Sequence, residues 1–424
     1  MRKIIFIILV VLASITINAQ VIQPSNALIG SWNGKLDVGG IALTLVLNLE
    51  QHDGYVGVTL DSPDQGAKGI SAEKEYLSDD SIAVKVTSLD ASYCARLKNG
   101  KLDGKFSQRG FSFPLVLERG DYESTIRRPQ HPQPPYPYLT EEVTFRNMKD
   151  SATLAGTITY PVGYDRQTKK KPVVVLLISG SGQQNRDEEV MGHKPFLVIA
   201  DYFARHGIAT LRYDDRGYGA SVGGEAGMSA TTEDFMRDAA AGIDFLRNRK
   251  QFRKVGCLGH SEGGAIVFML AARKKADFII SMAGPGVKGD TLLVAQSNLI
   301  EKLAGSPERL SVKQYREQES VKNMPWLKWF IDYDPSNDIR KSHCPVFALN
   351  GDRDCQVISS QNLTAIRQLL PKSKKNLIKE YPALNHLFQH CDTGLPTEYS
   401  SIEETISPEV LDDMVKWIKQ CFGI

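Results

Sequence analysis

Apolar residues stand at every second position along the first part of the chain. From residue 41 to residue 49 each odd position holds Ile or Leu, and a period of two is that of a strand with one buried face. Three later runs, at residues 55–60, 82–86 and 113–117, continue the pattern, with Asp-Gly and Asn-Gly turns between runs. A meander of short strands that buries one face must curl on itself. Residues 20–125 are therefore predicted to form a small all-β, barrel-like domain.

Five prolines interrupt this pattern between Arg127 and Tyr138. Because proline fixes φ and favours the extended polyproline II conformation, residues 126–140 are predicted to be a semi-rigid linker. We place the boundary between two domains here. A docking site for a partner protein is the alternative for such a segment, and it is the rarer use of one.

Strand-like and helix-like patterns alternate from residue 141 to residue 424. Two runs expected to pair antiparallel come first, at residues 141–146 and 152–160. The expected strands are then 172–178, 210–213, 255–258, 278–282, 346–350 and 377–381, and the expected helices 196–206, 231–249, 263–273 and 408–421. Such alternation indicates a mostly parallel sheet flanked by helices. Residues 287–342 interrupt the alternation of strands and helices, and we predict that they form an insertion that caps the sheet.

The N-terminal segment has the three parts of a secretory signal. Arg2 and Lys3 give it a positive start, residues 4–15 are an apolar run, and Ala19 precedes a plausible cleavage site. An uncleaved membrane anchor is the alternative, but the apolar run is short for a hydrocarbon core of about 30 Å. We therefore predict a signal peptide at residues 1–19 and an exported protein, periplasmic or secreted, without stable membrane association.

Composition and charge narrow the classes of function. At 424 residues the chain exceeds what one hydrophobic core usually serves, which favours two domains. The formal net charge is +2, and removal of Arg2 and Lys3 would leave the chain near neutrality. A chain near neutrality lacks the excess of positive charge that is typical of nucleic-acid binding. The six cysteines lack the paired spacing of a zinc site, so we expect no bound metal.

A Gly-x-Ser-x-Gly motif carries the chemistry. It consists of Gly259, His260, Ser261, Glu262 and Gly263, between a predicted strand and a predicted helix. A serine hydroxyl is a poor nucleophile unless a strained turn holds it beside a base, and glycines let the backbone make that turn. The motif therefore predicts Ser261 as the nucleophile of an acyl-transfer enzyme, with His260 in a structural role.

The acid and the base should follow the nucleophile along the chain, in the order serine, acid, histidine. Asp352 and Asp354 both follow a predicted strand; we predict Asp354, because Gly351 lets the chain turn away from the sheet before it. The last predicted strand leads to His386, which we expect to be the base, with His390 as its rival. His386 would take the proton of the serine, and the carboxylate would orient the imidazole.

Backbone N–H groups should stabilise the oxyanion of the intermediate. One donor is expected at Glu262, where the helix begins and its N–H groups have no intrahelical acceptor. The other should lie in the small-residue loop after the first parallel strand, where we predict Ser181, with Gly182 as a close alternative. A phosphate-binding loop is disfavoured, since no Lys-Ser/Thr pair follows these glycines.

Several motifs, in order, resemble those of one family. Besides the Gly-x-Ser-x-Gly segment, they are Ser179-Gly180-Ser181-Gly182, Asn185-Arg186-Asp187-Glu188, Asp215-Arg216-Gly217-Tyr218-Gly219-Ala220-Ser221, Asn350-Gly351-Asp352-Arg353-Asp354 and Leu384-Asn385-His386. They are similar to motifs of bacterial α/β-hydrolase esterases grouped with the serine aminopeptidase-like (S33-like) hydrolases. The resemblance spans residues 141–424 and implies an α/β-hydrolase fold, carboxylesterase activity and no cofactor.

The resemblance extends to two details. The similar esterases have a glycine, two variable residues and then the aspartate, which agrees with Asp354. Some of them also carry a small β-rich domain ahead of the hydrolase, and Gly30-Ser31-Trp32 is similar to the start of lipocalin-like barrels.

Three functions stay open at this point. A carboxylesterase acting on small-molecule acyl esters is the first. A serine peptidase of the aminopeptidase or prolyl-oligopeptidase type is the second, and four glutamates of the insertion could bind a substrate amino group: Glu301, Glu308, Glu317 and Glu319. The third is a ligand-binding protein, in which the β-domain recognises a ligand and the hydrolase activity is secondary.

Two further expectations concern the surroundings of the site. The insertion gathers Trp326, Trp329 and other aromatic residues, which would either set acyl-chain preference or pack as ordinary core. Cys355 and Cys391 adjoin the acid and base loops, and in an oxidising compartment a disulfide could join them if their Cα atoms lie within about 7 Å.

Overall fold

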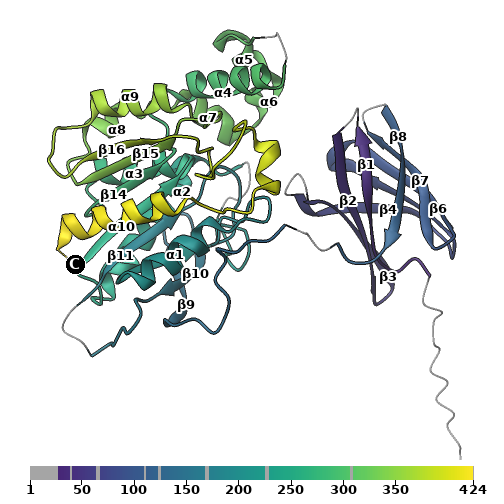
Figure 1. The fold of residues 1–424 in the computed structure, drawn as a ribbon, viewed down its shortest axis with the longest axis horizontal. Coiled ribbons are helices and arrows are strands. Elements are labelled where there is room, and N and C mark those ends of the chain that lie inside the picture. The colour runs from purple at the N-terminus through teal and green to yellow at the C-terminus, as the bar shows by residue number, and fades with distance from the viewer. Residues whose placement is uncertain are drawn as a thin grey trace, which may run out of the picture. The chain divides into compact units, whose positions relative to one another are not determined.

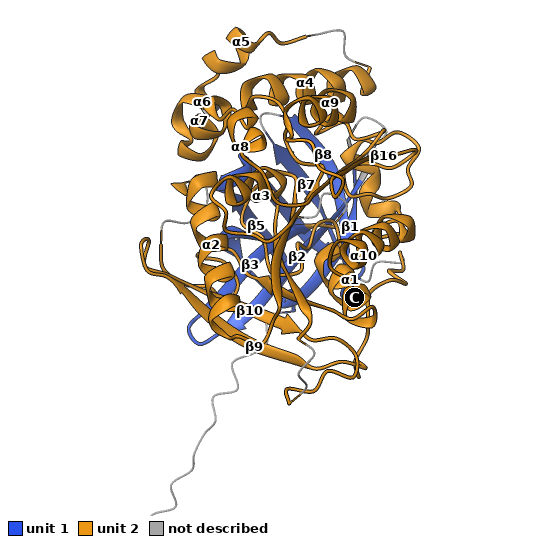
Figure 2. Ribbon diagram, turned by 90° about the vertical axis from the view of Figure 1, so that its left-hand side faces the viewer, with its two compact units in different colours: residues 1–61, 68–122 blue, residues 62–67, 123–424 orange. Residues whose placement is uncertain are grey.

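The computed structural model describes residues 27–38, 41–63, 67–108, 111–122, 126–167, 171–224, 229–305 and 309–423. The chain divides into two compact units, residues 1–61 with 68–122 and residues 62–67 with 123–424 (Figure 2). The predicted signal peptide lies outside the described residues. Among the helices that are described, none combines the length and the apolar character that a membrane span requires.

The first unit is a closed barrel in which eight strands follow one another in sequence order (Figure 1). Its strands are β1 (Gly30–Val38), β2 (Ile41–His52), β3 (Tyr55–Ser62), β4 (Ala67–Leu77), β5 (Ser81–Val86), β6 (Ala91–Lys98), β7 (Lys101–Gln108) and β8 (Phe111–Arg119). Alternate side chains, such as Leu45, Leu47 and Leu49, are buried in one apolar cluster with Trp32. The barrel-like domain expected from the period-two pattern is confirmed.

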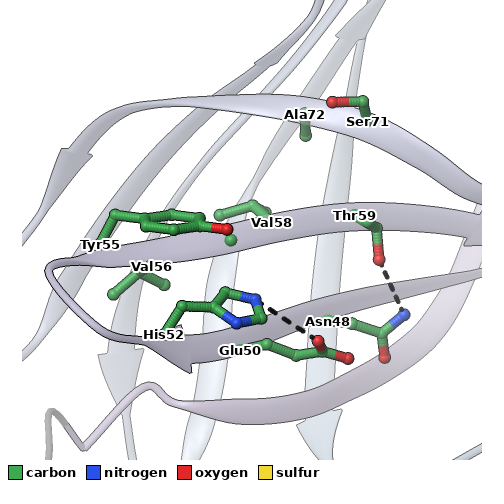
Figure 3. Close-up of a pocket in the computed structure, with 10 residues that line it drawn as sticks. Asn48, Glu50, His52, Tyr55, Val56, Val58, Thr59, Ser71 and Ala72 are labelled. Atoms are coloured by element: carbon green, nitrogen blue, oxygen red, sulfur yellow. Dashed lines mark hydrogen bonds and ion pairs between the residues drawn. The ribbon is translucent and has the colours of Figure 1, made fainter.

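A hollow of about 340 Å³ lies on this barrel near the β2–β3 turn. Asn48 and Glu50 line it and alternate with the buried Leu47 and Leu49, so they belong to the outer face of the strand. The rings of His52 and Tyr55 stack beside them, with centroids 4.9 Å apart (Figure 3). The described interior of the barrel is packed with side chains, and this hollow faces outward.

The second unit is built on an eight-stranded sheet in the order β16-β15-β14-β13-β11-β12-β10-β9. Its strands are β9 (Thr140–Asn147), β10 (Ala152–Thr159), β11 (Val173–Ile178), β12 (Ile208–Tyr213), β13 (Lys254–His260), β14 (Ile279–Met282), β15 (Val346–Gly351) and β16 (Leu377–Tyr381). β10 pairs antiparallel with β9 and β12, and the remaining neighbours are parallel. β12 lies between β10 and β11, so the third and fourth strands of this unit are exchanged relative to their order in the chain. This is the strand order of the α/β-hydrolase fold, and it confirms the predicted fold class.

Helices cover both faces of this sheet. They are α1 (Pro195–Arg205), α2 (Thr232–Asn248), α3 (Glu262–Ala272), α9 (Ser359–Leu369) and α10 (Pro408–Phe422). Val174 and Leu176 of β11 pack with α2, α3 and α9, whereas Val173 and Val175 pack with α1 and α10. All six residues of β11 are buried, as expected for a strand covered on both faces.

A helical segment separates β14 from β15, where the sequence predicts an insertion. Its described helices are α4 (Gly289–Leu303), α5 (Val312–Glu317), α6 (Glu319–Asn323), α7 (Pro325–Asp332) and α8 (Ser336–Arg340). Leu292 of α4 and Phe330 of α7 form a small apolar cluster with Val357, which follows β15. The segment is therefore packed against the loop that carries Asp354.

The proline-rich segment belongs to the second unit and is bound there by its polar residues. The Arg128 guanidinium donates to the carbonyls of Ser400 (2.7 Å), Ile402 (2.6 Å) and Met191 (3.2 Å). Gln130 exchanges hydrogen bonds with the backbone of Ile406. This end of the predicted linker is thus held against two loops of the hydrolase unit.

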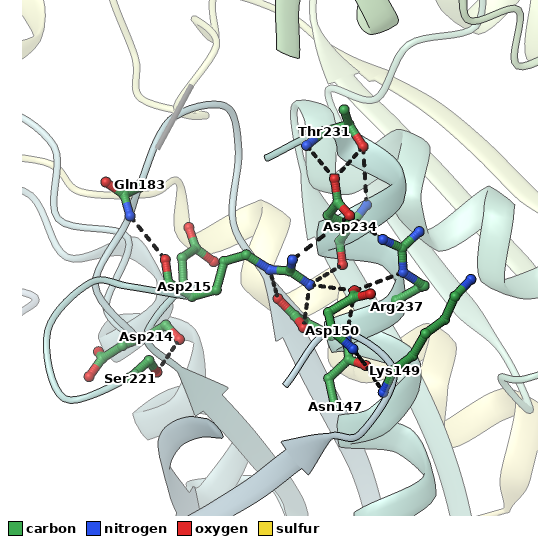
Figure 4. A network of polar contacts seen from close by, with 12 residues as sticks. Asn147, Lys149, Asp150, Gln183, Asp214, Asp215, Ser221, Thr231, Asp234 and Arg237 are labelled. Atoms are coloured by element: carbon green, nitrogen blue, oxygen red, sulfur yellow. Dashed lines mark hydrogen bonds and ion pairs between the residues drawn. The ribbon is translucent and has the colours of Figure 1, made fainter. Parts of the chain in front are cut away.

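A buried polar network supports the loop that follows β12. The Arg216 guanidinium is 1% exposed and donates to both carboxylate oxygens of Asp238, at 2.6 and 2.8 Å, and to Asp150 at 3.0 Å. Asp150 and Asp234 also bind Arg237, and the carboxylates converge with Asn147 in Figure 4. The carbonyl of Arg216 accepts from Gln183, in the loop after β11, at 2.9 Å. The network therefore joins the sheet edge and α2 to that loop.

Arg216→Ala should lower the free energy of unfolding by about 3–5 kcal/mol, because it leaves the buried Asp238 carboxylate without its cation. Chemical denaturation measures the loss. Arg166→Ala is the matched control: Arg166 pairs with Glu141 at 3.0 Å, but its side chain is 60% exposed. An exposed pair contributes at most about 1 kcal/mol, so equal losses for the two variants would contradict the prediction.

Candidate active site

The turn between β13 and α3 holds Ser261 in a strained backbone conformation. Its φ is 54° and its ψ is −117°, a region that L-residues rarely adopt. The flanking glycines are required by close contacts: a Cβ on Gly259 would lie 1.9 Å from the Gly263 carbonyl oxygen, and one on Gly263 would lie 2.2 Å from that of Ile178. The Ser261 N–H donates to Met282 at 2.9 Å, which fixes the turn to β14. The turn thus presents Ser261 at the start of α3.

The loops after β15 and β16 bring Asp354 and His386 together. The Nδ1 of His386 lies 2.8 Å from the Oδ2 of Asp354, and both side chains are almost fully buried. The Oδ1 of Asp354 accepts the N–H groups of Gln356 and Val357, at 2.8 and 2.9 Å. The carboxylate is therefore fixed by its own loop and bound to one nitrogen of the imidazole.

The two rival residues have other partners. Asp352 accepts the N–H of Ala383 at 2.7 Å and acts as a turn carboxylate between the two loops. The exposed His390 binds Glu404 through Nδ1 at 2.8 Å. The geometry thus pairs Asp354 with His386 and leaves Asp352 and His390 outside the pair.

The loop after β11 lies beside Ser261. Gly180 is so close that a Cβ on it would lie 3.2 Å from the Ser261 Cβ. Its own N–H donates to Glu188 at 2.8 Å. The buried Asp215 accepts from the Ser179 hydroxyl at 3.1 Å and from the Gln184 N–H at 2.9 Å. These contacts hold the loop at both ends, with Ser181 between them.

A cavity of about 310 Å³ opens at Ser261 and His386. Apolar side chains from the loops and from α4 and α7 form much of its lining: Val190, Met191, Pro285, Leu292, Leu293, Trp326, Phe330, Val357, Leu387 and Pro396. Polar residues, including Ser181, Gln184, Gln296 and Gln356, complete it. A small, mostly apolar cavity with a few convergent polar groups is typical of a small-molecule site.

The side chain of Glu262 is a feature that the sequence reasoning missed, because it considered only the backbone N–H. The carboxyl group is 2% exposed, and the indole N–H of Trp326 lies 3.0 Å from each of its oxygens. Burial raises the pKa of Glu262, while the hydrogen bond from Trp326 opposes that shift. The sequence did offer a signal for this side chain, because Glu262 is a charged residue at the start of an otherwise apolar helix.

The disulfide expected between Cys355 and Cys391 is wrong for this structure, in which both are free thiols. The Cys355 thiol donates to the carbonyl of Gly394 at 3.1 Å, and the Cys391 thiol donates to that of Ala383 at 3.6 Å. Burial raises the pKa of Cys355 to about 12 and that of Cys391 to about 11. Each thiol is thus occupied by a different carbonyl and stays protonated near neutral pH.

No group of three or more His, Cys, Asp or Glu side chains within the described ranges could hold a metal ion. Ser261 and His386 line one cavity, and Asp354 binds the imidazole of His386.

Comparison with known proteins places this geometry in context. Residues 194–389 match the family described as serine aminopeptidase, S33. The chain is 28% identical to esterase EstD of Thermotoga maritima over 278 residues, which are 62% of this chain and 65% of that protein. It therefore spans somewhat less than two thirds of the length of this curated relative.

Solved structures similar to the second unit include two esterases and a peptidase. Est1E from Butyrivibrio proteoclasticus with bound ferulic acid is 15% identical, with a TM-score of 0.48 and coverage of 66% of this chain and 100% of that one. Esterase Pf2001 of Pyrococcus furiosus is 16% identical, with a TM-score of 0.45 and coverage of 68% and 92%. Proline iminopeptidase of Mycobacterium smegmatis is 14% identical, with a TM-score of 0.45 and coverage of 66% and 98%.

Proposed function

We propose that the chain is a serine carboxylesterase for small acyl esters, and the match of residues 194–389 to the serine aminopeptidase (S33) family supports a hydrolase. One observation carries the proposal: Ser261, on its strained turn, lines the same cavity as His386, whose ring is bound by Asp354. The similarity to the esterase EstD supports an ester rather than another substrate.

The reaction follows from the roles of these groups. Ser261 Oγ attacks the ester carbonyl carbon while His386 takes its proton, and Asp354 stabilises the resulting imidazolium. The backbone N–H groups of Glu262 and Ser181 donate to the oxyanion of the tetrahedral intermediate. His386 then gives the proton to the leaving alcohol. A water molecule, activated by His386 in the same way, releases the acid from the acyl-enzyme and regenerates Ser261.

We assign the helices between β14 and β15 to the acyl side of the cavity. Leu292, Leu293, Trp326 and Phe330 come from this segment and supply apolar surface next to Ser261. The volume of about 310 Å³ lies at the lower end of the range for ligand cavities, which favours short acyl chains.

Trp326→Ala should shift the substrate preference toward longer acyl chains, because the indole occupies space in the cavity. The ratio of kcat/KM for a p-nitrophenyl octanoate to that for the acetate should rise about tenfold or more, as expected for a few methylenes in an apolar pocket. Trp329→Ala is the matched control. Its ring stacks on Tyr333 and packs in the apolar core, so its loss should lower Tm and leave the ratio unchanged. A shift in both variants, or in neither, would contradict this assignment.

A peptidase is the competing function within the same family. Recognition of a free amino terminus needs a carboxylate in the cavity, but Glu301, Glu317 and Glu319 are exposed on the helical segment, and Glu308 lies outside the described residues. The two carboxylates that do line the cavity are already bound, Glu262 by Trp326 and Glu188 by His260. The deciding experiment compares p-nitrophenyl acetate with an aminoacyl p-nitroanilide at equal concentration. We expect hydrolysis of the ester to dominate; faster release from the anilide would replace the esterase proposal with the peptidase.

A further inference from the structure

A second buried carboxylate–histidine pair lies next to the first. His260 precedes the nucleophile and is 6% exposed, and Glu188, in the loop between β11 and α1, is 3% exposed. The Nδ1 of His260 lies 3.0 Å from the Oε1 of Glu188, and its Nε2 lies 2.9 Å from the backbone oxygen of His386. The two histidine rings are 4.7 Å apart between centroids. Neither Glu188 nor His260 has a chemical role in the ester reaction described above.

The atoms around His260 determine its protonation state. A carbonyl oxygen only accepts hydrogen bonds, so the contact with His386 requires a proton on Nε2. A neutral imidazole would then direct the lone pair of Nδ1 at a carboxylate oxygen 3.0 Å away. Both contacts are hydrogen bonds when His260 carries two protons and Glu188 carries the negative charge.

Glu188 is held in the orientation that this ion pair needs. Its Oε1 also accepts the N–H of Gly180, at 2.8 Å, while its buried Oε2 has no hydrogen-bond partner within the described part of the chain. The charge of Glu188 is therefore balanced mainly by His260. The backbone of Glu188 has a φ of 51°, which is unfavourable for a residue other than glycine. This strained backbone occurs at the residue whose carboxylate reaches both His260 and Gly180.

We propose that Glu188 and His260 form a positioning pair that holds the backbone of the catalytic base His386 and the peptide before the oxyanion donor Ser181, and that only the protonated pair does so. The inference rests on the proposed function of Ser261 and His386. The imidazolium fixes the carbonyl of His386, while Asp354 fixes its ring. Through Gly180, the same carboxylate orients the loop that carries Ser181.

The electrostatic surroundings determine the pH range in which the pair persists. Burial lowers the pKa of His260, but Glu188 through its charge and hydrogen bond, the carbonyl of His386 and the charge of Asp354 together raise it above its ordinary value. A raised pKa means that His260 keeps its second proton to a higher pH than an ordinary imidazole and loses it as the pH rises through that value. A neutral His260 can donate to only one of its two acceptors, and the negative charge of Glu188 favours keeping the proton on Nδ1. The hydrogen bond from Nε2 to His386 is then the one that is lost, and activity falls on the alkaline side.

Glu188→Gln is the first test, read as kcat/KM against pH. The amide oxygen can still accept from Gly180, but the negative charge that holds the second proton on His260 is gone. The alkaline limb should move down by about 1–3 pH units, the shift typical of a close opposite charge. The acidic limb should stay in place, because the substitution leaves the contact between Asp354 and His386 unchanged. We expect kcat to fall more than KM rises, and Glu188→Asp to restore part of the alkaline limb.

His206→Asn is the matched control, because His206 also bonds a backbone carbonyl, that of Tyr202 at 2.7 Å, at the end of α1 away from the cavity. Its pH profile should follow that of the wild type. A Glu188→Gln profile that is uniformly lowered, with both limbs unmoved, would overturn the proposal and leave Glu188 a purely structural role.

Nitrogen-15 NMR of the histidines in the wild-type protein is the second test, and its readout does not depend on esterase activity. We expect one histidine, assigned by its disappearance in His260→Gln, to carry protons on both ring nitrogens at pH 7 and above. A neutral His260 at pH 7 would overturn the positioning pair whatever the enzyme hydrolyses. A doubly protonated His260 in a protein that cleaves no ester would instead reject the proposed function and retain the pair.

Discussion

Ser261→Ala should lower kcat for ester hydrolysis by about 10⁴- to 10⁶-fold, the usual cost of removing a triad serine. The loss should leave the fold intact, because Ser261 is part-exposed at the turn and its backbone N–H, not its side chain, makes the bond to Met282. Steady-state hydrolysis of p-nitrophenyl acetate measures the loss, and thermal unfolding checks the fold.

Labelling by a fluorophosphonate gives an independent reading of the same site. The wild type should be labelled at Ser261, and Ser261→Ala should not be labelled. Ser373→Ala is the matched control, since Ser373 is an exposed serine whose hydroxyl accepts only a local N–H, that of Lys375. Retained activity in Ser261→Ala, or labelling that persists elsewhere in that variant, would show that another residue is the nucleophile.

The turn around Ser261 could be predicted from sequence because backbone geometry there dictates residue type. A Cβ on Gly259 would overlap the Gly263 carbonyl, so the close contact within the turn requires glycine there. This requirement is visible in the few consecutive residues of the motif. The strands were predictable for a similar reason: a run such as β11, buried on both faces, must be apolar throughout. Local constraints of this kind leave a pattern within a few residues.

The polar contacts between distant segments left no such pattern. Glu262 and Trp326 are 64 residues apart, His260 and Glu188 are 72 apart, and Arg128 and Ile402 are 274 apart. Each pair depends on how segments that are distant in the chain come together in the folded unit. The sequence could place His260 in the turn, but it could not show which carboxylate reaches it or which carbonyl its other nitrogen contacts.

The loops of the predicted acid and base were partly predictable from the sequence. Parallel strands end at the same edge of a sheet, so the loops after β15 and β16 were expected to lie near each other. The choice between Asp352 and Asp354 depended on where each side chain points, and position along the chain gave only an argument from the turn at Gly351. The structure supplies the missing contacts, because each carboxylate has its own set of donors.

Asp354→Asn should lower kcat by roughly 10⁴-fold, as the same change does in the chymotrypsin-type triad. The surrounding N–H groups explain why. Gln356 and Val357 both donate to Oδ1, so the oxygen of the asparagine must occupy that position and its NH₂ must face His386. An NH₂ group facing Nδ1 stabilises the tautomer whose proton is on Nε2, and that nitrogen can no longer accept the proton of Ser261. The variant should fold and bind ester but not cleave it.

Asp352→Asn is the control, and its expected result follows from the same reasoning. Asp352 accepts one N–H, that of Ala383, and the amide oxygen of asparagine can accept it equally well. Neither orientation of the new NH₂ group meets the imidazole, so the tautomer of His386 and most of the activity should be retained. Measured kcat values for the two variants, with Tm as the check on folding, decide between the carboxylates. If Asp352→Asn were nearly inactive and Asp354→Asn active, the hydrogen bond between Asp354 and His386 would be structural and the acid would have to be Asp352.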